Sequence, residues 1–553
     1  MDSLHTFSAS GTHTWGKHFG SLVVVIAFTI LQVNGQGSWK LLSDNVGIAS
    51  MHTAVTHYGS VIMLDRTNIG PSNITLPKGR CRNNPDDLML KHDCYAHSVE
   101  FWPKSGRVRP LFIWSDTWCS SGQFGADGTL VQTGGDYTGI SAIRRFVPCA
   151  ESDGKCDWKE DKAKMYEHRW YASNQLLPDG TFIVVGGRAQ FTLEFVPPKS
   201  GNATYLPLLE ETNDFQADNM YPFVHLLPDG NLFIFANRDS IIYDYKKNLT
   251  LRKLPRIPGT PRSYPSAGSS VMLPLQAGDG FSRVEILICG GAQLGAWAHP
   301  ERKLSAANDC GRMVVTDPDP EWIMEKMPIR RNMGDMVLLP NHHTLIINGA
   351  KRGSQGWGFA EDPALHPVEY DPYGTPGYRF TIMNPTFIPR LYHSTANLLP
   401  DGSVLLAGSN THQFYTFNDT YNTELRVEQF LPEYLSSDYD YLRPVITESP
   451  KSVGHGENFT ITVTIPSRPL FENQIELVLL SSPFTTHSYS QGQRMLNLGV
   501  EEPILLDADS GSYSYQITGR SPPSGNVAPA AYYMLFAVNY HVPGEAVWLQ
   551  IVA

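Results

Sequence analysis

An adjacent phenol and imidazole, Tyr392 and His393, lie in the stretch RLYHSTANLLPDGSVLLAG, residues 390–408. An imidazole can bind a metal ion or transfer a proton, and a phenol can donate or accept a hydrogen bond. The second half of the stretch has two apolar runs joined by Pro-Asp-Gly, which is typical of a tight β-hairpin. The hairpin pattern recurs along the chain, whereas the Tyr-His pair does not. An unrepeated polar pair on a repeated scaffold indicates a functional site.

The cysteine count draws attention to a second motif, TWCSSGQ, which contains Cys119. If the chain folds in an oxidising compartment, pairing of neighbours leaves Cys119 single, although sequence alone does not determine connectivity. Cys119 is then either a buried inert thiol or a residue consumed by other chemistry. The expected disulfides are Cys81–Cys94, Cys149–Cys156 and Cys289–Cys310.

Seven hairpin-like segments between Ala54 and Gly408 predict the scaffold. The turn glycines Gly128, Gly180 and Gly230 are spaced by 52 and 50 residues. A hairpin unit that repeats at about 50 residues is typical of kelch-type propeller blades. We therefore expect an all-β fold, with a seven-bladed β-propeller over residues 36–430.

Repeat phase places a third motif, RWYAS, beside the first. Tyr171 and Tyr392 precede the glycine of the following Pro-Asp-Gly by 9 and 10 residues. Because blades set equivalent positions around one axis, we expect both tyrosines near the central channel. His168-Arg169-Trp170 precedes Tyr171, and we assign Trp170 to packing.

The pattern changes after a linker at residues 431–442. Residues 443–553 contain alternating strands without the blade signature, which predicts an immunoglobulin-like β-sandwich. Within it, the polar run FTTHSYSQGQR, residues 484–494, is expected to be a long loop that carries His487.

The N-terminal segment and the glycosylation sequons point to export. Residues 1–35 have the apolar core of a signal peptide, with a membrane anchor as the alternative. N-linked glycans are expected at five sequons, which predicts a secreted protein of the extracellular space or cell wall. The net charge of −11 argues against a nucleic-acid partner. The sequon residues are Asn73, Asn202, Asn248, Asn418 and Asn458.

With TWCSSGQ, RWYAS, RLYHS and TTHSYSQGQR in this order on a seven-bladed frame, the sequence resembles the galactose oxidase and glyoxal oxidase family of copper radical oxidases. The resemblance covers Trp39 to Ala553 and is closer to the glyoxal oxidase branch. It implies one copper ion and a Cys119–Tyr171 thioether, with a tyrosyl radical on Tyr171. Tyr392 is then an axial ligand and general base, and His393 and His487 are equatorial ligands. Two imidazoles with phenolate oxygens suit tetragonal Cu(II).

The resemblance implies oxidation of small aldehydes such as glyoxal or methylglyoxal to carboxylic acids, with reduction of O₂ to hydrogen peroxide, by a monomer that is free of the membrane after signal removal. A primary-alcohol or sugar oxidase with the same mechanism is the first alternative. A non-catalytic kelch module that binds a protein or glycan is a remoter one. A hydrolytic propeller would need converging arginines and carboxylates, and no such set recurs in phase.

One position departs from the galactose oxidases. There a tryptophan after a Gly-Gly pair stacks on the cross-linked tyrosine, but here Gly186-Gly187 is followed by Arg188-Ala189. Galactose as the substrate is therefore disfavoured. Phe191 and Trp357 are substitutes for the stacking residue that the sequence offers without further support.

Overall fold

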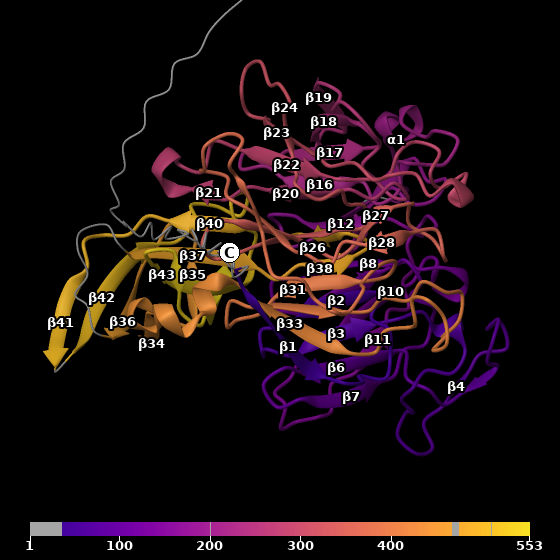
Figure 1. The fold of residues 1–553 in the computed structure, drawn as a ribbon, viewed down its shortest axis with the longest axis horizontal. Helices are drawn as coiled ribbons and strands as arrows, with labels where there is room; N and C mark the ends of the chain where they lie inside the picture. The colour runs from indigo at the N-terminus through magenta and orange to yellow at the C-terminus, as the bar shows by residue number, and fades with distance from the viewer. Residues whose placement is uncertain (1–35, 200, 467–474, 510) are drawn as a thin grey trace, which may run out of the picture. The chain divides into compact units, whose positions relative to one another are not determined.

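The structure, a computed structural model, describes residues 36–199, 201–466, 475–509 and 511–553 (Figure 1). The predicted signal peptide lies outside these residues. Residues 35–553 form one compact unit. In the part of the chain that the structure describes, no helix is long and apolar enough to cross a membrane.

The Pro-Asp-Gly segments form the expected tight hairpins. In LLPDGSVLLAG, β31 (Thr395–Leu398) pairs antiparallel with β32 (Val404–Ala407). Gly402 in the turn has φ 84°, which glycine adopts without the strain that a Cβ would cause. Both strands are buried along their whole length, because neighbouring blades cover both faces.

Seven such hairpins extend into four-stranded antiparallel sheets, which are the blades of a propeller. The first three blades contain β2 (His52–Val55), β3 (Val61–Leu64), β6 (Ser98–Trp102) and β7 (Arg107–Leu111); β8 (Ser121–Phe124), β9 (Leu130–Thr133), β10 (Ile143–Phe146) and β11 (Trp158–Glu160); and β12 (Ser173–Leu176), β13 (Phe182–Val185), β14 (Thr192–Val196) and β15 (Thr204–Tyr205). The next two contain β16 (Phe223–Leu226), β17 (Leu232–Ala236), β18 (Asp239–Asp244) and β19 (Leu249–Lys253), and then β20 (Ser269–Met272), β22 (Glu285–Cys289), β23 (Asp309–Val314) and β24 (Ile323–Lys326). The last two contain β25 (Asp335–Leu338), β26 (Thr344–Ile347), β29 (Val368–Tyr370) and β30 (Phe380–Ile382), and then β31, β32, β33 (Val427–Leu431) and β1 (Ser38–Ser43).

The N-terminal strand closes the ring. β1 pairs antiparallel with β33, so the seventh blade combines the first strand with three strands from far along the chain. The innermost strands of most neighbouring blades contact each other, and β31 of the last blade contacts β2 of the first. Closure in this way leaves only short, protected edges.

Two further sheets form the C-terminal sandwich, seen with β34, β36, β41 and β42 at the left of Figure 1. The predicted all-β class, a seven-bladed propeller followed by a sandwich, is therefore confirmed. One sheet contains β35 (Ser452–Gly454), β37 (Ile475–Ser481), β40 (Met495–Leu498), β43 (Ala531–Asn539) and β45 (Val547–Val552), with β44 (Val542–Pro543) paired to β43 and β21 (Leu275–Gln276) contributed by the fifth blade; the other contains β34 (Val445–Glu448), β36 (Asn458–Pro466), β42 (Ser512–Arg520) and β41 (Ile504–Asp509).

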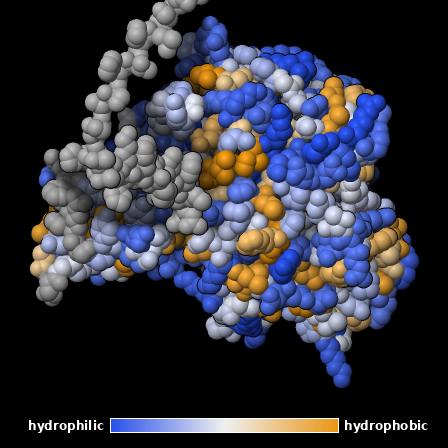
Figure 2. Space-filling model, viewed as in Figure 1, coloured by the Kyte–Doolittle hydropathy of each residue, from blue (hydrophilic) through white to orange (hydrophobic). Residues whose placement is uncertain are grey.

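Helix is scarce among the described residues, as the Gly- and Pro-rich composition predicts. There is one short α-helix, α1 (Pro207–Glu211), together with 3-10 turns that include Glu433–Leu435 and Ser437–Leu442 in the expected linker. The face in Figure 2 is largely hydrophilic, and its hydrophobic residues form separate patches.

The polar run at residues 484–494 differs from the expected loop. It forms a β-hairpin, β38 (Phe484–Thr486) and β39 (Tyr489–Gln491), and β38 pairs with β2. Together the two strands contact the innermost strands of all seven blades, so the hairpin occupies the central channel. Most of its polar side chains are buried and hydrogen-bonded: the Thr485 hydroxyl, for example, accepts a hydrogen bond from the Asn397 amide at 3.1 Å. Because a channel lined by polar groups requires polar partners, a polar sequence here forms buried strands.

The three expected disulfides are confirmed. Cys81–Cys94, Cys149–Cys156 and Cys289–Cys310 are bonded, and Cys119 is a free, buried thiol. The last disulfide joins residues directly opposite each other on β22 and β23.

His225, a buried histidine next to Tyr489 of the β38–β39 hairpin, makes the stability of the fold depend on pH. Burial, with a smaller contribution from the charge of Arg494, lowers the pKa of His225 to about 3. The unfolded chain binds a proton at a pKa of about 6.5, so stability should be lost as pH falls from 6.5 towards 3. His225 should account for about 2 kcal/mol of the loss at pH 5. Urea unfolding of His225→Gln should show a smaller drop between pH 7 and pH 5. The exposed His299→Gln serves as control, and equal drops in both variants would contradict this origin.

Candidate metal centre

Six blades each present one residue with a left-handed backbone, two positions before the innermost strand. Such conformations are uncommon for residues other than glycine and concentrate at functional sites. The backbone N–H of Tyr171 donates to the carbonyl of Cys119 at 3.0 Å, and that of Tyr221 donates to Tyr171 at 2.9 Å, which links neighbouring blades. The six are Cys119 (φ 52°), Tyr171 (φ 65°), Tyr221 (φ 46°), Ala267 (φ 43°), Met333 (φ 56°) and His393 (φ 65°).

This pattern corrects the expected phase. The residue equivalent to Tyr171 is His393, not Tyr392, because both precede their innermost strand by two residues. Tyr392 lies one position earlier, which agrees with its greater distance from the Pro-Asp-Gly turn. Tyr171 and His393 each precede the glycine of their turn by nine residues, so the two blades have equal spacing from the left-handed residue to the turn.

His487 reaches the same place from the C-terminal region. It lies at the tip of the β38–β39 hairpin, where His487 and Ser488 have φ 47° and 69°. Positive φ at both central residues is the geometry of a type I′ turn. The His487 Nε2 lies 3.2 Å from the Cys119 Sγ, and the rings of His393 and His487 are 4.9 Å apart.

The two predicted tyrosines join this cluster through a third tyrosine that the sequence analysis missed. The hydroxyl of Tyr264 lies 3.1 Å from that of Tyr171 and 2.9 Å from that of Tyr392. Its blade carries the small Ala267 at the left-handed position, and Tyr264 comes three residues earlier. Tyr264 lies outside the repeat phase. Its place in the segment RSYPSAG, before the innermost strand of its blade, is the only sequence signal for it, and that signal is weak.

Tyr264 is also the ring that stacks on Tyr171. Their centroids are 4.4 Å apart with an interplanar angle of 26°. Neither substitute offered by the sequence has this role. Trp357 stacks on Trp118 instead, and Phe191 packs against the apolar core between the third and fourth blades. Trp170 contacts the Tyr171 ring at 4.7 Å and so lies beside the centre, not only in packing.

The residues present fit a metal ion. One ligand atom each from Cys119, His393 and His487 lie within 4.8 Å of one another, and all three side chains are buried. The His393 Nε2 is buried without a hydrogen-bond partner among the described residues. Buried polar atoms are normally satisfied, so this orphaned nitrogen fits the ligand atom that a bound cation would require.

Burial sets the protonation of these groups. It lowers the pKa of His393 and of His487 well below the ordinary value, which keeps both imidazoles neutral, the form that binds metals. Burial, followed by the neighbouring Cys119 thiol and Tyr264 phenol, raises the pKa of Tyr171 and of Tyr392 well above the usual range. A nearby cation favours the phenolate, because opposite charges stabilise each other.

Two family matches cover most of the chain. Residues 51–434 match the glyoxal oxidase N-terminus, and residues 443–551 match the galactose oxidase-like early set domain. The chain belongs to the glyoxal oxidase family. Among relatives of the family, it is 53% identical over 517 residues to an aldehyde oxidase of Vitis pseudoreticulata, covering 93% of this chain and 97% of that one.

Other relatives are more distant. An aldehyde oxidase of Arabidopsis thaliana is 40% identical over 533 residues, with 94% of this chain and 85% of that one covered. A fungal alcohol oxidase solved in complex with copper superposes with a TM-score of 0.69 at 20% identity, covering 94% of this chain and 100% of that one. At that identity the likeness shows the fold alone.

Proposed function

We propose that this glyoxal oxidase family member is a copper radical oxidase that converts small aldehydes to carboxylic acids and reduces O₂ to hydrogen peroxide. The observation that carries the proposal is the meeting of five residues at one axis. Cys119, Tyr171, Tyr392, His393 and His487 come from three blades and the C-terminal hairpin, and all are buried. Aldehyde oxidase relatives at 53% and 40% identity support the same reaction.

In this proposal, His393 and His487 hold the copper through imidazole nitrogens, and the Tyr171 and Tyr392 oxygens complete the set. This N,O donor set suits Cu(II). Bound copper supplies one-electron redox chemistry and an acid centre for the substrate oxygen. The reaction RCH(OH)₂ + O₂ → RCOOH + H₂O₂ transfers two electrons, so the protein must provide a second one-electron site.

Tyr171 is proposed as that second site. The Tyr171 backbone N–H donates to the carbonyl of its neighbour Cys119 at 3.0 Å, and both side chains lie in one buried cluster. A bond between the Cys119 sulfur and a Tyr171 ring carbon removes two hydrogen atoms, which O₂ accepts as H₂O₂. The sulfur then donates electron density to the ring and stabilises a radical on it.

Tyr392 is proposed to accept a proton from the hydrated aldehyde, as a general base within reach of the substrate should. Tyr264 is a positioning residue, because its hydroxyl hydrogen-bonds both Tyr171 and Tyr392 while its ring covers Tyr171. A cavity of about 440 Å³ lies next to this cluster, and Trp357 and Tyr421 line it. Such a volume admits small substrates.

Secretion and glycosylation also belong to the proposal. Three disulfides are typical of an oxidising compartment. All five sequon asparagines are exposed, which glycan attachment requires. The leader-like residues 1–35 point to the same route.

The test is a panel of aldehydes and matching primary alcohols with coupled peroxide detection, on copper-loaded protein. We expect one peroxide per O₂ consumed and at least about tenfold higher kcat/KM for the aldehyde of each pair, a difference of about 1.4 kcal/mol in transition-state stabilisation. Reversal of that preference would indicate the alcohol oxidase alternative. Absence of peroxide with every compound would overturn the proposal.

A further inference from the structure

Arg66 is a buried cation with no ionic partner among the described residues. It follows β3 and is 3% exposed. Its guanidinium carbon lies 4.7 Å from the ring centroid of Trp118 and 5.2 Å from that of Trp357. The Nε and Nη2 atoms are buried without a hydrogen-bond partner in the same part of the chain. An unpartnered buried donor costs about 1–3 kcal/mol, and more when charged, so its retention requires an explanation.

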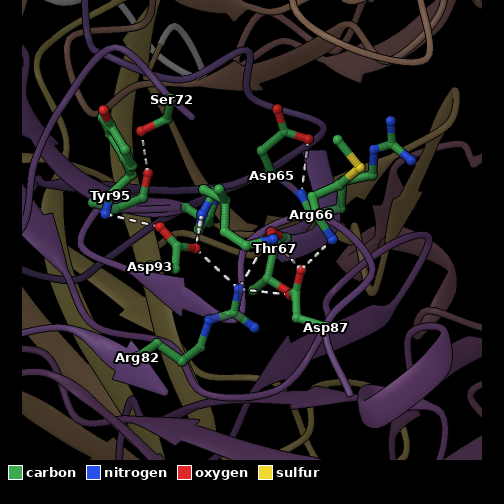
Figure 3. A network of polar contacts seen from close by, with 12 residues as sticks. Asp65, Arg66, Thr67, Ser72, Arg82, Asp87, Asp93 and Tyr95 are labelled. Carbon is green, nitrogen blue, oxygen red and sulfur yellow. Dashed lines mark hydrogen bonds and ion pairs between the residues drawn. The ribbon is translucent and has the colours of Figure 1, made fainter. Parts of the chain in front are cut away.

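The loop around Arg66 is held rigidly. The Arg66 backbone N–H donates to the Asp65 carboxylate at 2.8 Å, and the Thr67 N–H donates to Asp116 at 2.8 Å. Behind them, the Arg82 guanidinium bonds Asp87 and Asp93 at 2.7 and 3.0 Å in the network that Figure 3 shows. Arg66 is therefore placed by its surroundings, although its Nε and Nη2 lack a hydrogen-bond partner in the described structure.

Three indoles next to Arg66 also have buried N–H donors without a hydrogen-bond partner in the described structure. The Nε1 atoms of Trp118, Trp170 and Trp357 are all buried and unpartnered in the described structure. Their rings touch: Trp118 lies 5.2 Å from Trp170 and 5.4 Å from Trp357, centroid to centroid. One cation and three indoles thus form a cluster of donors that lacks acceptors among the residues described.

Nearby carboxylates do not give the region around this donor cluster a net negative charge. The charge of Arg66 acts on Asp65, Asp116 and Asp136, but no ion pair joins it to any of these three described residues. Two other guanidiniums balance these acids. Arg144 donates to the backbone carbonyl of Asp116 at 2.8 Å and its charge acts on the Asp116 carboxylate, while the charge of Arg188 acts on Asp136. Arg144 also lies 4.0 Å from Glu160, and Glu160 pairs with Lys164 at 2.5 Å, so four acids and four basic side chains leave the region close to neutral.

The cluster also adjoins the metal centre. Trp118 precedes Cys119 and Trp170 precedes Tyr171 in the chain, and Trp357 lines the cavity of about 440 Å³. We propose that Arg66 with the indoles of Trp118, Trp170 and Trp357 forms a carboxylate-binding subsite. A carboxylate offers two oxygens with about four acceptor positions and pairs well with the planar guanidinium.

The carboxylate has two sources, if the proposed oxidase function holds. It is either the acid that the reaction produces or a second acidic group on the aldehyde substrate. The subsite itself does not depend on turnover, so binding to metal-free protein tests it separately from the proposed function.

The binding test uses the full-length, metal-free protein and follows tryptophan fluorescence during titration with acetate. Neutral acetamide has the same shape and serves as the control ligand. We expect saturable quenching by acetate and none by acetamide at the same concentrations. Arg66→Met should weaken acetate binding at least about tenfold, since it removes the charge-assisted bond. Arg256→Met, which removes an exposed guanidinium outside this cluster, should change it less than about twofold.

A second variant tests the subsite independently, in case Arg66→Met does not fold. Trp357→Phe retains a stacked ring but removes one donor, and it should weaken binding about threefold to tenfold. Equal responses to acetate and acetamide, or wild-type binding by folded Arg66→Met, would overturn the subsite.

Turnover by copper-loaded protein then separates the two sources. If the substrate carries the acid, Arg66→Met should lower the ratio of kcat/KM for glyoxylate to that for glyoxal at least about tenfold. If the product is the ligand, that ratio should hold while the inhibition constant of the acid product rises. Either outcome supports the subsite, and absence of both effects contradicts it.

Discussion

Replacing Cys119 with serine should reduce turnover by about a thousandfold, equivalent to about 4 kcal/mol of transition-state stabilisation. The reason is that a serine hydroxyl at this position cannot form the thioether, so a radical on Tyr171 becomes harder to generate. Copper binding should remain largely intact, because His393, His487 and the two phenols are unchanged. Peroxide production and copper content, measured on the same preparations, check both parts.

Mass spectrometry of the wild-type protein tests the bond itself. The peptide with Cys119 should be joined to the one with Tyr171 and be lighter than their sum by two hydrogen atoms, about 2 Da, and the link should survive strong reducing agent. Protein made without copper should keep a free thiol. Tyr264→Phe is a matched control, since it retains the stacked ring and should still form the link.

A different role for Cys119 would appear as a distinct result. Its Sγ lies 3.2 Å from the His487 Nε2, and two histidines with a thiolate form the trigonal site of blue-copper proteins. A free Cys119 with an intense sulfur-to-copper absorption band would support that arrangement. Wild-type turnover by Cys119→Ser would exclude both arrangements and leave an inert thiol.

Removing both imidazoles in His393→Ala with His487→Ala should abolish copper binding and peroxide production. Wild-type protein should contain about one copper per chain, because an N,O site of this kind favours Cu(II). The double variant should contain less than about a tenth of that, since two of the nitrogen ligands are gone. Metal analysis after copper loading and dialysis measures the change.

The control for this pair is His299→Ala, which removes an exposed imidazole elsewhere. Copper loading should raise the melting temperature of wild type and of His299→Ala but not of the double variant, because a ligand that binds only the folded state stabilises it. Unchanged copper content in the double variant, or zinc in its place in the wild type, would refute the assigned centre.

Repeating patterns made much of the fold predictable. A hairpin signal depends on neighbouring residues, so the Pro-Asp-Gly turns identified the blades without knowledge of their neighbours. The disulfides joined the nearest cysteines, and this left Cys119 as the exception. Tyr171, Tyr392, His393 and His487 were marked because unrepeated polar residues beside regular strands are conspicuous, and because their motifs resemble a known family.

Residues outside the repeat required the tertiary structure. Tyr264 enters the centre from three residues before the left-handed Ala267, a placement that a linear pattern does not convey. The polar run around His487 forms strands only because seven blades enclose it and supply polar partners. Arg66 and Trp357 meet across more than 290 residues, and their unpartnered donors are evident only when every buried neighbour is known. Short-range periodicity is therefore decided by sequence alone, whereas side-chain direction and long-range contact are decided by packing around the axis.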